Sequence, residues 1–511
     1  MMERRLKLAK TLLNPDNSVL IVTIDEKEYL RLGMLLQQIF PEARQQMVSS
    51  VISPGGVPRE REFTRVNEFL FFVMVGGSGP AKAQSDLLFT AWKTDDENRS
   101  PIWRGLLRGG SGPLRSDSPL KFYPIFVNPE EGRIVGCGDP LPREMDRPAL
   151  VAPPGIEVVW PLKTGGVEGR WELNRETFEA RRLLGYVKLG RRNRTTGQWG
   201  VSYLREAEIA RLANGELLSA GMTKSGHLEI DYAPGRSRQL YAKSVWNEPS
   251  HDAGTHGAGA VKALVPGRKF DFPKSLYAVE DTLRLFVADK PDAVILDFFA
   301  GSGTTAHAVM RLNKQDGGRR QCISVTNNEV SAEEQKALRT KGLRPGDPEW
   351  KAQGICDYIT KPRIEAAITG RTPDGEPIKG DYKFTDEFPM ADGFEANAEF
   401  FTLTYEAPLS VQHNRAFAQI APLLWLRAGA TGRRIEEVTE DFAIADTYAV
   451  LFDLDCARQF VEAVGARIKV AYVVTDDERG YQSVCAQLPE GVEPVRLYSS
   501  YLTNFSFGGE D

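Results

Sequence analysis

A turn of small residues between two apolar stretches constrains this chain more than any other feature. Residues 293–296 (AVIL) have the composition of a buried strand, residues 297–303 (DFFAGSG) contain two glycines, and residues 304–312 have helical spacing. Because glycine has no Cβ, the backbone of such a turn can approach a ligand closely. The helix that follows offers unpaired N–H groups and the positive end of its dipole. The stretch therefore predicts a strand–turn–helix unit that holds a cofactor.

The residues around the turn limit which cofactor fits. The sequence GSGTTA at 301–306 matches the GxGxxG pattern of nicotinamide-binding turns only loosely. Asp297 stands just before the glycines, where a carboxylate can accept from an ammonium group. A second apolar run, 322–326, ends in the polar residues NNE at 327–329, where a ribose would lie. S-adenosylmethionine has both an amino-acid end and a ribose, so the pattern favours it. A phosphate ligand stays open on spacing alone.

Strand and helix patterns alternate in two separate parts of the first 335 residues. Residues 1–95 contain β-rich runs such as 19–24 and 67–75, separated by helical spacing, and the alternation returns at 256–335. This alternation predicts an α/β sheet that is mainly parallel. Residues 96–255 are dense in Gly, Pro, Arg and Trp and lack long helical periodicity, which indicates an inserted recognition module.

Basic residues cluster inside this module. No acidic residue occurs from 180 to 199, where basic side chains lie among Tyr186, Gln198 and Trp199. Basic residues interleaved with aromatic and amide side chains suit contacts to phosphates and bases. A solvated basic face without a ligand is the alternative. The predicted DNA-binding residues are Arg181, Arg182, Lys188, Arg191, Arg192 and Arg194.

Charge is divided unevenly along the chain, although the net charge is only −5. Residues 381–511 hold 22 acidic and 10 basic residues, whereas residues 1–380 hold 47 acidic and 54 basic residues. We expect residues 336–380 to be a linker and residues 381–511 to be an acidic α+β accessory domain. An acidic domain is better suited to a protein partner than to DNA.

Cysteine, histidine and hydropathy patterns argue against several other classes. The five cysteines show no CxxC spacing, which argues against a structural zinc site or a disulfide framework. His251 and His256 flank Asp252, but no carboxylate-rich cluster accompanies them, so we expect no metal. No apolar run approaches the roughly 20 residues that span a bilayer. The expected location is the cytoplasm, without a membrane partner.

Two segments together resemble the cofactor half of a DNA amino-methyltransferase. They are FDFPKS at 270–275 and ILDFFAGSGTTAHAV at 295–309. Both are similar to the beta-group adenine-N6 enzymes, which include the modification subunits of type III restriction systems. In that family both segments bind S-adenosylmethionine, and the catalytic half, the target-recognition module and the cofactor half follow in that order. The resemblance therefore implies a Rossmann-like S-adenosylmethionine-dependent methyltransferase sheet in circularly permuted order.

The predicted cofactor site combines these two segments with the polar residues after the second apolar run. Segments 5–13 and 67–71 also resemble parts of the family, namely the helix after its catalytic loop and a strand that shapes the target-base pocket. The predicted cofactor-binding residues are Phe272, Pro273, Lys274, Asp297, Phe299, Ala300, Gly301, Gly303, Thr304, Asn328 and Glu329.

The family's catalytic loop, DPPY or NPPY, is not found in the sequence. In that loop a polar side chain and a proline carbonyl accept from the exocyclic amine, and an aromatic ring stacks on a flipped base. The Pro-Pro pair at 153–154 has neither of these flanking residues, and residue 5 already lies in the segment that should follow the loop. We therefore expect a chain that begins late and is inactive alone, and we assign no catalytic residue.

The resemblance implies a site-specific DNA methyltransferase that methylates the exocyclic amine of adenine in duplex DNA, within a restriction-modification or related defence system. The expected partners are double-stranded DNA and a restriction subunit or a second methyltransferase chain. One alternative is a non-catalytic truncated subunit that binds DNA or cofactor and is completed by another chain. A nucleotide-binding oxidoreductase is a further alternative.

Overall fold

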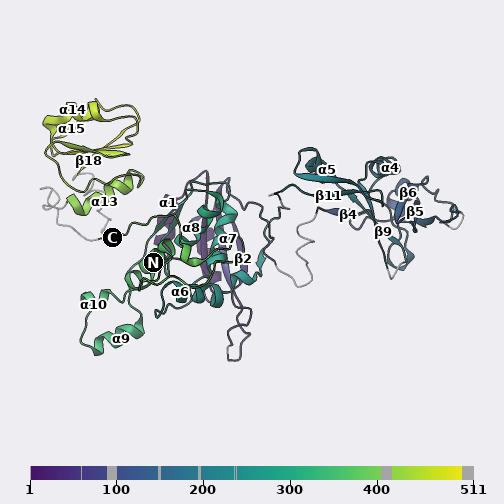
Figure 1. The fold of residues 1–511 in the computed structure, drawn as a ribbon, viewed down its shortest axis with the longest axis horizontal. Helices are drawn as coiled ribbons and strands as arrows, with labels where there is room; N and C mark the ends of the chain where they lie inside the picture. The colour runs from purple at the N-terminus through teal and green to yellow at the C-terminus, as the bar shows by residue number, and fades with distance from the viewer. Residues whose placement is uncertain are drawn as a thin grey trace. The chain divides into compact units, whose positions relative to one another are not determined.

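The computed structural model describes residues 2–58, 60–88, 101–147, 151–193, 197–234, 236, 239–403 and 417–497 (Figure 1). The chain divides into two compact units, Met1–Asn397 and Ala398–Asp511, which are described separately. Among the described residues, no helix is long and apolar enough to cross a membrane.

The N-terminal part forms a four-stranded sheet. Its elements are α1 (Met2–Leu12), β1 (Asn17–Ile24), α2 (Tyr29–Ile39), β2 (Arg44–Val51) and β3 (Asn67–Gly76), and the strand order is β1-β3-β2-β12, where β12 is Val245–Trp246. The strand β3 is antiparallel to both β1 and β2, whereas β12 is parallel to β2. The expectation of a mainly parallel sheet is therefore wrong for this part, because an apolar run indicates a buried strand but not its direction.

Both faces of this sheet are covered by helices. On one face, α1 and α2 pack against alternate residues of the strands, including Leu20 and Phe71. On the other face, Leu285 and Phe286 of α7 (Leu276–Val287) pack against Phe72. Burial on both faces explains why β3 reads as the continuous apolar run FLFFVMV.

The expected strand–turn–helix unit is present. The strand β13 (Val294–Asp297) leads through the glycine turn into α8 (Thr304–Asp316), and β14 (Gln321–Ser324) pairs in parallel with β13. The helices α7 and α8 lie next to each other (Figure 1). They share a core cluster that includes Leu283 and Val309. The predicted α/β class is confirmed by this arrangement.

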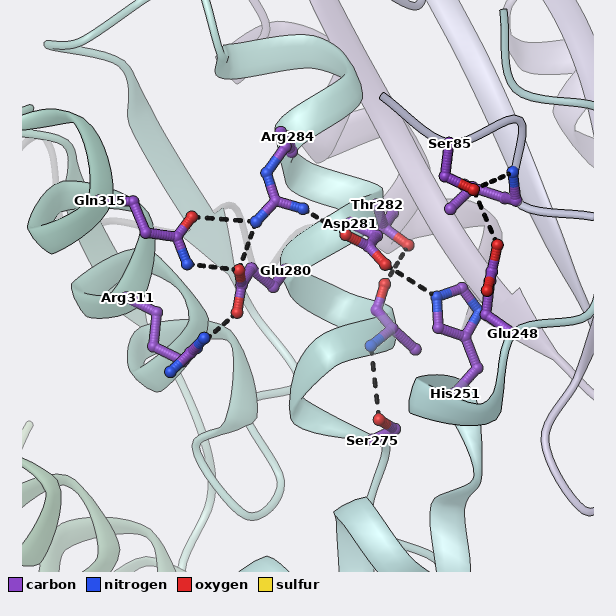
Figure 2. Close-up of polar contacts among 12 residues, drawn as sticks. Ser85, Glu248, His251, Ser275, Glu280, Asp281, Thr282, Arg284, Arg311 and Gln315 are labelled. Atoms are coloured by element: carbon purple, nitrogen blue, oxygen red, sulfur yellow. Dashed lines mark hydrogen bonds and ion pairs between the residues drawn. The ribbon is translucent and has the colours of Figure 1, made fainter. Parts of the chain in front are cut away.

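A buried polar network crosses the helix α7 (Figure 2). Glu280 accepts from the guanidinium of Arg311 on α8, with Nε and Oε2 2.5 Å apart, and it also forms an ion pair with Arg284. The next residue, Asp281, accepts from Nε2 of His251 at 3.1 Å. His251 follows the sheet in η5 (Pro249–His251), so the network joins α8 and α7 to the N-terminal part.

The middle of the first unit contains three small sheets around short strands. They are β4-β9-β8 (Trp103–Gly105, Trp199–Leu204, Val187–Arg192), β6-β5-β7 (Arg133–Cys137, Ile125–Asn128, Glu157–Val159) and β10-β11 (Leu217–Met222, Leu228–Tyr232). Two helices, α4 (Arg175–Leu183) and α5 (Glu206–Ala213), accompany them. This part has its own core, in which Tyr123, Trp171 and Phe178 are buried.

Residues 336–397 differ from the expected linker and domain start. They include most of α9 (Ala332–Thr340), all of α10 (Pro348–Lys351) and α11 (Lys361–Thr369), and a segment that follows them. Ala367 on α11 and Tyr382 and Phe394 in that segment lie in the same core cluster as α8. These residues therefore belong to the first unit, because burial against α8 holds a segment whose composition alone resembles a connector.

The second unit contains a four-stranded sheet in the order β15-β16-β17-β18. The strands are Phe442–Ile444, Tyr448–Leu451, Val470–Val474 and Glu493–Leu497, and the last three are parallel. The helices α14 (Ala457–Ala463) and α15 (Glu478–Cys485) connect these parallel strands, and α13 (Phe417–Arg427) precedes the sheet. Buried Tyr448 and Tyr472 pack with α13 in one core cluster.

Candidate functional site

The glycine turn lies at the carboxyl ends of β13 and β14. Gly301 and Gly303 have φ angles of +52° and +77°, in the left-handed region that favours glycine. The turn is fastened to the end of β14, since Ala300 N donates to Val325 O at 3.2 Å and Val325 N donates to Asp297 O at 2.7 Å. Gly303 is the N-cap of α8, so the first free N–H groups of a 13-residue helix start at the turn.

The FDFPK segment, residues 270–274, lies against this turn. A Cβ added to Gly301 would stand 3.5 Å from the ring of Phe270, so the two segments are in direct contact. Phe272 has a φ of +56° and its side chain is 91% exposed, while Pro273 is buried. A bulky residue in the left-handed region is strained, and such strain tends to occur at ligand-binding sites.

Two contacts fix the end of the FDFPK segment. Lys274 forms an ion pair with Glu68, a buried residue of β3, so the segment is tied to the N-terminal sheet. Gly257 lies in the π-helix η6 (Gly254–Ala258), where an added Cβ would stand 2.4 Å from the backbone oxygen of Pro273. Only glycine at 257 allows the two backbones to come this close.

Two residues that the sequence analysis did not single out form side-chain hydrogen bonds to the turn. Thr360 Oγ1 donates to Gly301 O at 2.6 Å. The fully buried guanidinium of Arg363 donates from Nη1 to Ser302 Oγ at 2.7 Å and to Thr304 Oγ1 at 2.8 Å. Both residues are about 60 positions downstream of the turn, and no local motif marks them.

Two ionisable side chains close to the turn, Arg363 and His307, are fully buried. Burial lowers the pKa of Arg363 to about 10, and its Nε and Nη2 atoms have no hydrogen-bond partner among the described residues. Nearby, His307 on α8 shares a 2.8 Å hydrogen bond with the Tyr382 hydroxyl. Burial, with Arg363 and Arg311 close by, lowers the pKa of His307 well below its usual value. His307 therefore stays neutral and belongs to the packed core.

The last two predicted cofactor residues follow β14. The amide of Asn328 donates to Lys351 O at 2.7 Å and to Asp357 Oδ2 at 2.9 Å. The backbone oxygen of Glu329 accepts from Ile355 N at 2.9 Å. The structure thus brings together the ends of β13 and β14 and the FDFPK segment. Whether each residue contacts a cofactor stays a prediction.

Two of the predicted DNA-binding residues are mostly buried and have carboxylate partners. Arg181 forms an ion pair with Glu206 and donates to Leu204 O at 2.7 Å. Arg182 is paired with Glu179, three residues earlier on α4, at 2.5 Å. Both side chains are mostly buried, so they stabilise the module whether or not they approach a ligand.

The other basic candidates lie on or next to β8. Lys188 stands over the ring of Trp103 with Nζ 5.6 Å from its centroid. Arg191 and Arg192 are exposed, and Arg192 also pairs with a carboxylate on β7 at 2.9 Å. Arg194 lies outside the described residues. A DNA contact by this strand stays a prediction.

Comparison with known proteins places this geometry in a family. A family model described as DNA methylase matches residues 1–337. The type II methyltransferase M.KpnI of Klebsiella pneumoniae is 26% identical over 316 residues, which cover 61% of this chain and 63% of that protein. The type III EcoPI Mod subunit of Escherichia phage P1 is 26% identical over 333 residues, which cover 64% of this chain and 44% of the subunit.

The chain spans only part of the length of these two relatives, so the similarity supports the predicted family and not a particular activity. The match spans less than two thirds of the length of M.KpnI and less than half of the EcoPI subunit. A crystal structure of an M1.HpyAVI–SAM complex matches 67% of this chain and 83% of that chain at 10% identity, with a TM-score of only 0.24. The predicted family is confirmed by the match over residues 1–337, and the chain belongs to the DNA methylase family.

Proposed function

We propose that the protein is part of a site-specific DNA methyltransferase that methylates the exocyclic amine of adenine in duplex DNA, with S-adenosylmethionine as methyl donor. The observation that most supports this proposal is the glycine turn between β13 and α8, with the FDFPK segment packed against it. The chain belongs to the DNA methylase family. A restriction-modification or related defence system, in the cytoplasm, is the proposed setting.

The residues at the turn fit this methyl donor. The turn offers glycine backbone that a Cβ would otherwise fill, and the strongly exposed rings of Phe272 and Phe299 can stack on an adenine. Asp297 Oδ1 accepts from Phe299 N at 3.1 Å, and its carboxylate can also accept from the ammonium group of the amino-acid end. S-adenosylmethionine would supply a methyl group on a positively charged sulfur. The chain's own part is to bind and orient it at the end of the sheet.

Calorimetry and methyl transfer test this proposal. We expect the chain to bind S-adenosylmethionine and not NAD, and Asp297→Ala to weaken this binding by about tenfold or more, or about 1.4 kcal/mol. Tritiated methyl transfer to duplex DNA measures the activity, and we expect Asp297→Ala to lower it together with the affinity for S-adenosylmethionine. Binding of NAD without S-adenosylmethionine would favour the oxidoreductase alternative and contradict the proposal.

DNA binding is proposed for the exposed basic side chains of β8. Replacing Arg191 with alanine should weaken binding to any duplex severalfold and lower the slope of log affinity against log salt by about one, because one phosphate contact is lost. Fluorescence anisotropy between about 50 and 200 mM salt measures both quantities. Arg133→Ala on β6, which removes another exposed arginine of the module, is the matched control. If both variants showed the same slope of log affinity against log salt, Arg191 would not contact DNA phosphates.

A restriction subunit or a second methyltransferase chain is the proposed protein partner, as the names of the type III relatives suggest. The alternative is a binding subunit that another polypeptide completes. It is favoured by one specific observation: among the described residues, β1 pairs only with β3 and β13 pairs only with β14, so each strand has an unpaired edge.

A further inference from the structure

One buried arginine of the first unit has no carboxylate partner. A buried charge is costly unless an opposite charge lies beside it, so buried arginines are normally paired. Among the described residues four arginines are buried, and three of them form ion pairs: Arg115 with Glu168, Arg311 with Glu280, and Arg320 with Asp316. The fourth, Arg363 on α11, is fully buried and forms no ion pair with a described residue. Its pKa of about 10 keeps it charged at neutral pH.

The hydrogen bonds of Arg363 lead from α11 into the glycine turn. Its Nη1 donates to Ser302 Oγ and to Thr304 Oγ1, and these two hydroxyl oxygens are 3.1 Å apart. Because both oxygens accept from the guanidinium, both hydroxyl protons are left to donate elsewhere. One proton can join the two oxygens, and the other has no acceptor among the described residues. A chain of hydrogen bonds thus runs from a buried cation to a turn hydroxyl that still needs an acceptor.

The start of α8 lies at the same place and favours the same kind of ligand. The N-cap is Gly303, and no side-chain hydrogen bond caps the helix there. The first N–H groups of the helix therefore have no acceptor within it, and the helix dipole places partial positive charge at this end. The charge of Arg363 adds to that of the dipole, so the start of α8 favours an anionic group.

The charges at the two ends of the turn suit a carboxylate that has an ammonium group beside it. Asp297 is half-buried at the start of the turn, where its carboxylate would repel a phosphate. An amino-acid group can place its ammonium near Asp297 and its carboxylate near α8, so that both of its charges have partners. The cationic group of Lys274 is already paired with buried Glu68, which leaves Arg363 as the charge that a ligand would balance.

We propose that Arg363 is a positioning residue for the carboxylate of the methyl donor, acting through the hydroxyls of Ser302 and Thr304 at the start of α8. This role rests on the proposed function and deepens it, because it assigns the group that orients the amino-acid end of S-adenosylmethionine. Arg363 lies beyond residues 1–337, so the match to the family model does not include it.

Calorimetry with two matched ligands tests this role. They are S-adenosylhomocysteine, which remains after the methyl group is transferred, and its decarboxylated form, in which hydrogen replaces the carboxylate. Neither ligand has a methyl group to transfer, so the readout is affinity and not activity. We expect the unchanged protein to bind S-adenosylhomocysteine about tenfold or more tightly than the decarboxylated form. Replacing Arg363 with methionine should reduce this preference by about tenfold, mainly through weaker binding of S-adenosylhomocysteine.

Three further variants separate charge from packing. Arg320→Met is the matched control, because Arg320 is also a buried arginine but is paired with Asp316, and its preference should equal that of the unchanged protein. Arg363→Lys keeps the charge and should restore part of the preference. Thr304→Val leaves Arg363 in place and should lower the preference severalfold, so it tests the role even if Arg363→Met does not fold. Circular dichroism before each titration shows which variants are folded.

Two results would overturn the role of Arg363 and leave the proposed function standing. One is a preference that Arg363→Met and Thr304→Val leave unchanged. The other is an equal loss of affinity for both ligands, which would mean that Arg363 supports only the shape of the turn. A protein that binds neither ligand would instead refute the proposed function, and the role of Arg363 with it. A loss confined to the ligand with the carboxylate, partly restored by lysine, is the result expected of a positioning residue.

Discussion

Replacing Glu280 with alanine is expected to lower the free energy of unfolding of the first unit by about 3–5 kcal/mol. The carboxylate of Glu280 is buried and accepts from Arg311 at 2.5 Å and from the Gln315 amide at 2.7 Å (Figure 2). Arg311 is fully buried, and its other contacts are stacking on Tyr277 and Tyr382 and long hydrogen bonds of 3.3–3.5 Å to backbone oxygens. Without Glu280 its charge would be buried and unpaired.

Chemical unfolding of the full chain, followed by circular dichroism, measures this change. Glu3→Ala is the control, because Glu3 pairs with Lys7 on the exposed face of α1 and such a pair contributes at most about 1 kcal/mol. Glu280→Gln keeps a hydrogen-bond acceptor and should fall between the two. If Glu280→Ala were no more harmful than Glu3→Ala, the network across α7 would not stabilise the fold.

The sequence predicts correctly those parts of the site whose residues are close together in the chain. The order strand, turn, helix at 293–312 follows from apolar runs and two glycines, and the structure confirms it. Arg363 could not be found in this way, because it meets the turn only through the packing of α11 on α8. The same packing explains the wrong linker prediction, since small buried residues such as Ala366 and Ala367 carry no strong hydrophobic signal.

Charge patterns along the sequence were a weaker guide to surfaces. The window 180–199 contains no acidic residue, yet Arg181 and Arg182 pair with carboxylates outside it, at Glu206 and Glu179. Residues 3 apart on a helix are neighbours, and α5 brings Glu206 back to α4 from a distant position. A count over a linear window cannot detect such partners. Arg191, which is exposed near the end of β8, is a stronger candidate for DNA contact.

Replacing Gly257 with alanine is expected to weaken binding of S-adenosylmethionine by more than about tenfold, or about 1.4 kcal/mol. The added Cβ would stand 2.4 Å from the backbone oxygen of Pro273, a separation at which one of the two segments must move. Pro273 lies between η6 and Lys274, which is fixed by its ion pair with Glu68. The clash would therefore displace the FDFPK segment where it contacts the glycine turn.

Calorimetry of the folded variants measures this effect, and Gly259→Ala is the matched control. Gly259 is two residues further along the same helical stretch, and its added Cβ would be 3.7 Å from the nearest atom, an ordinary contact. We expect its affinity to stay close to that of the unchanged protein, and both variants should show the same helix content. Equal affinities for the two variants would contradict the placement of the FDFPK segment in the methyl-donor site. A loss confined to Gly257→Ala, in a protein that is still folded, would mean that this close approach of two backbones sets the shape of the site.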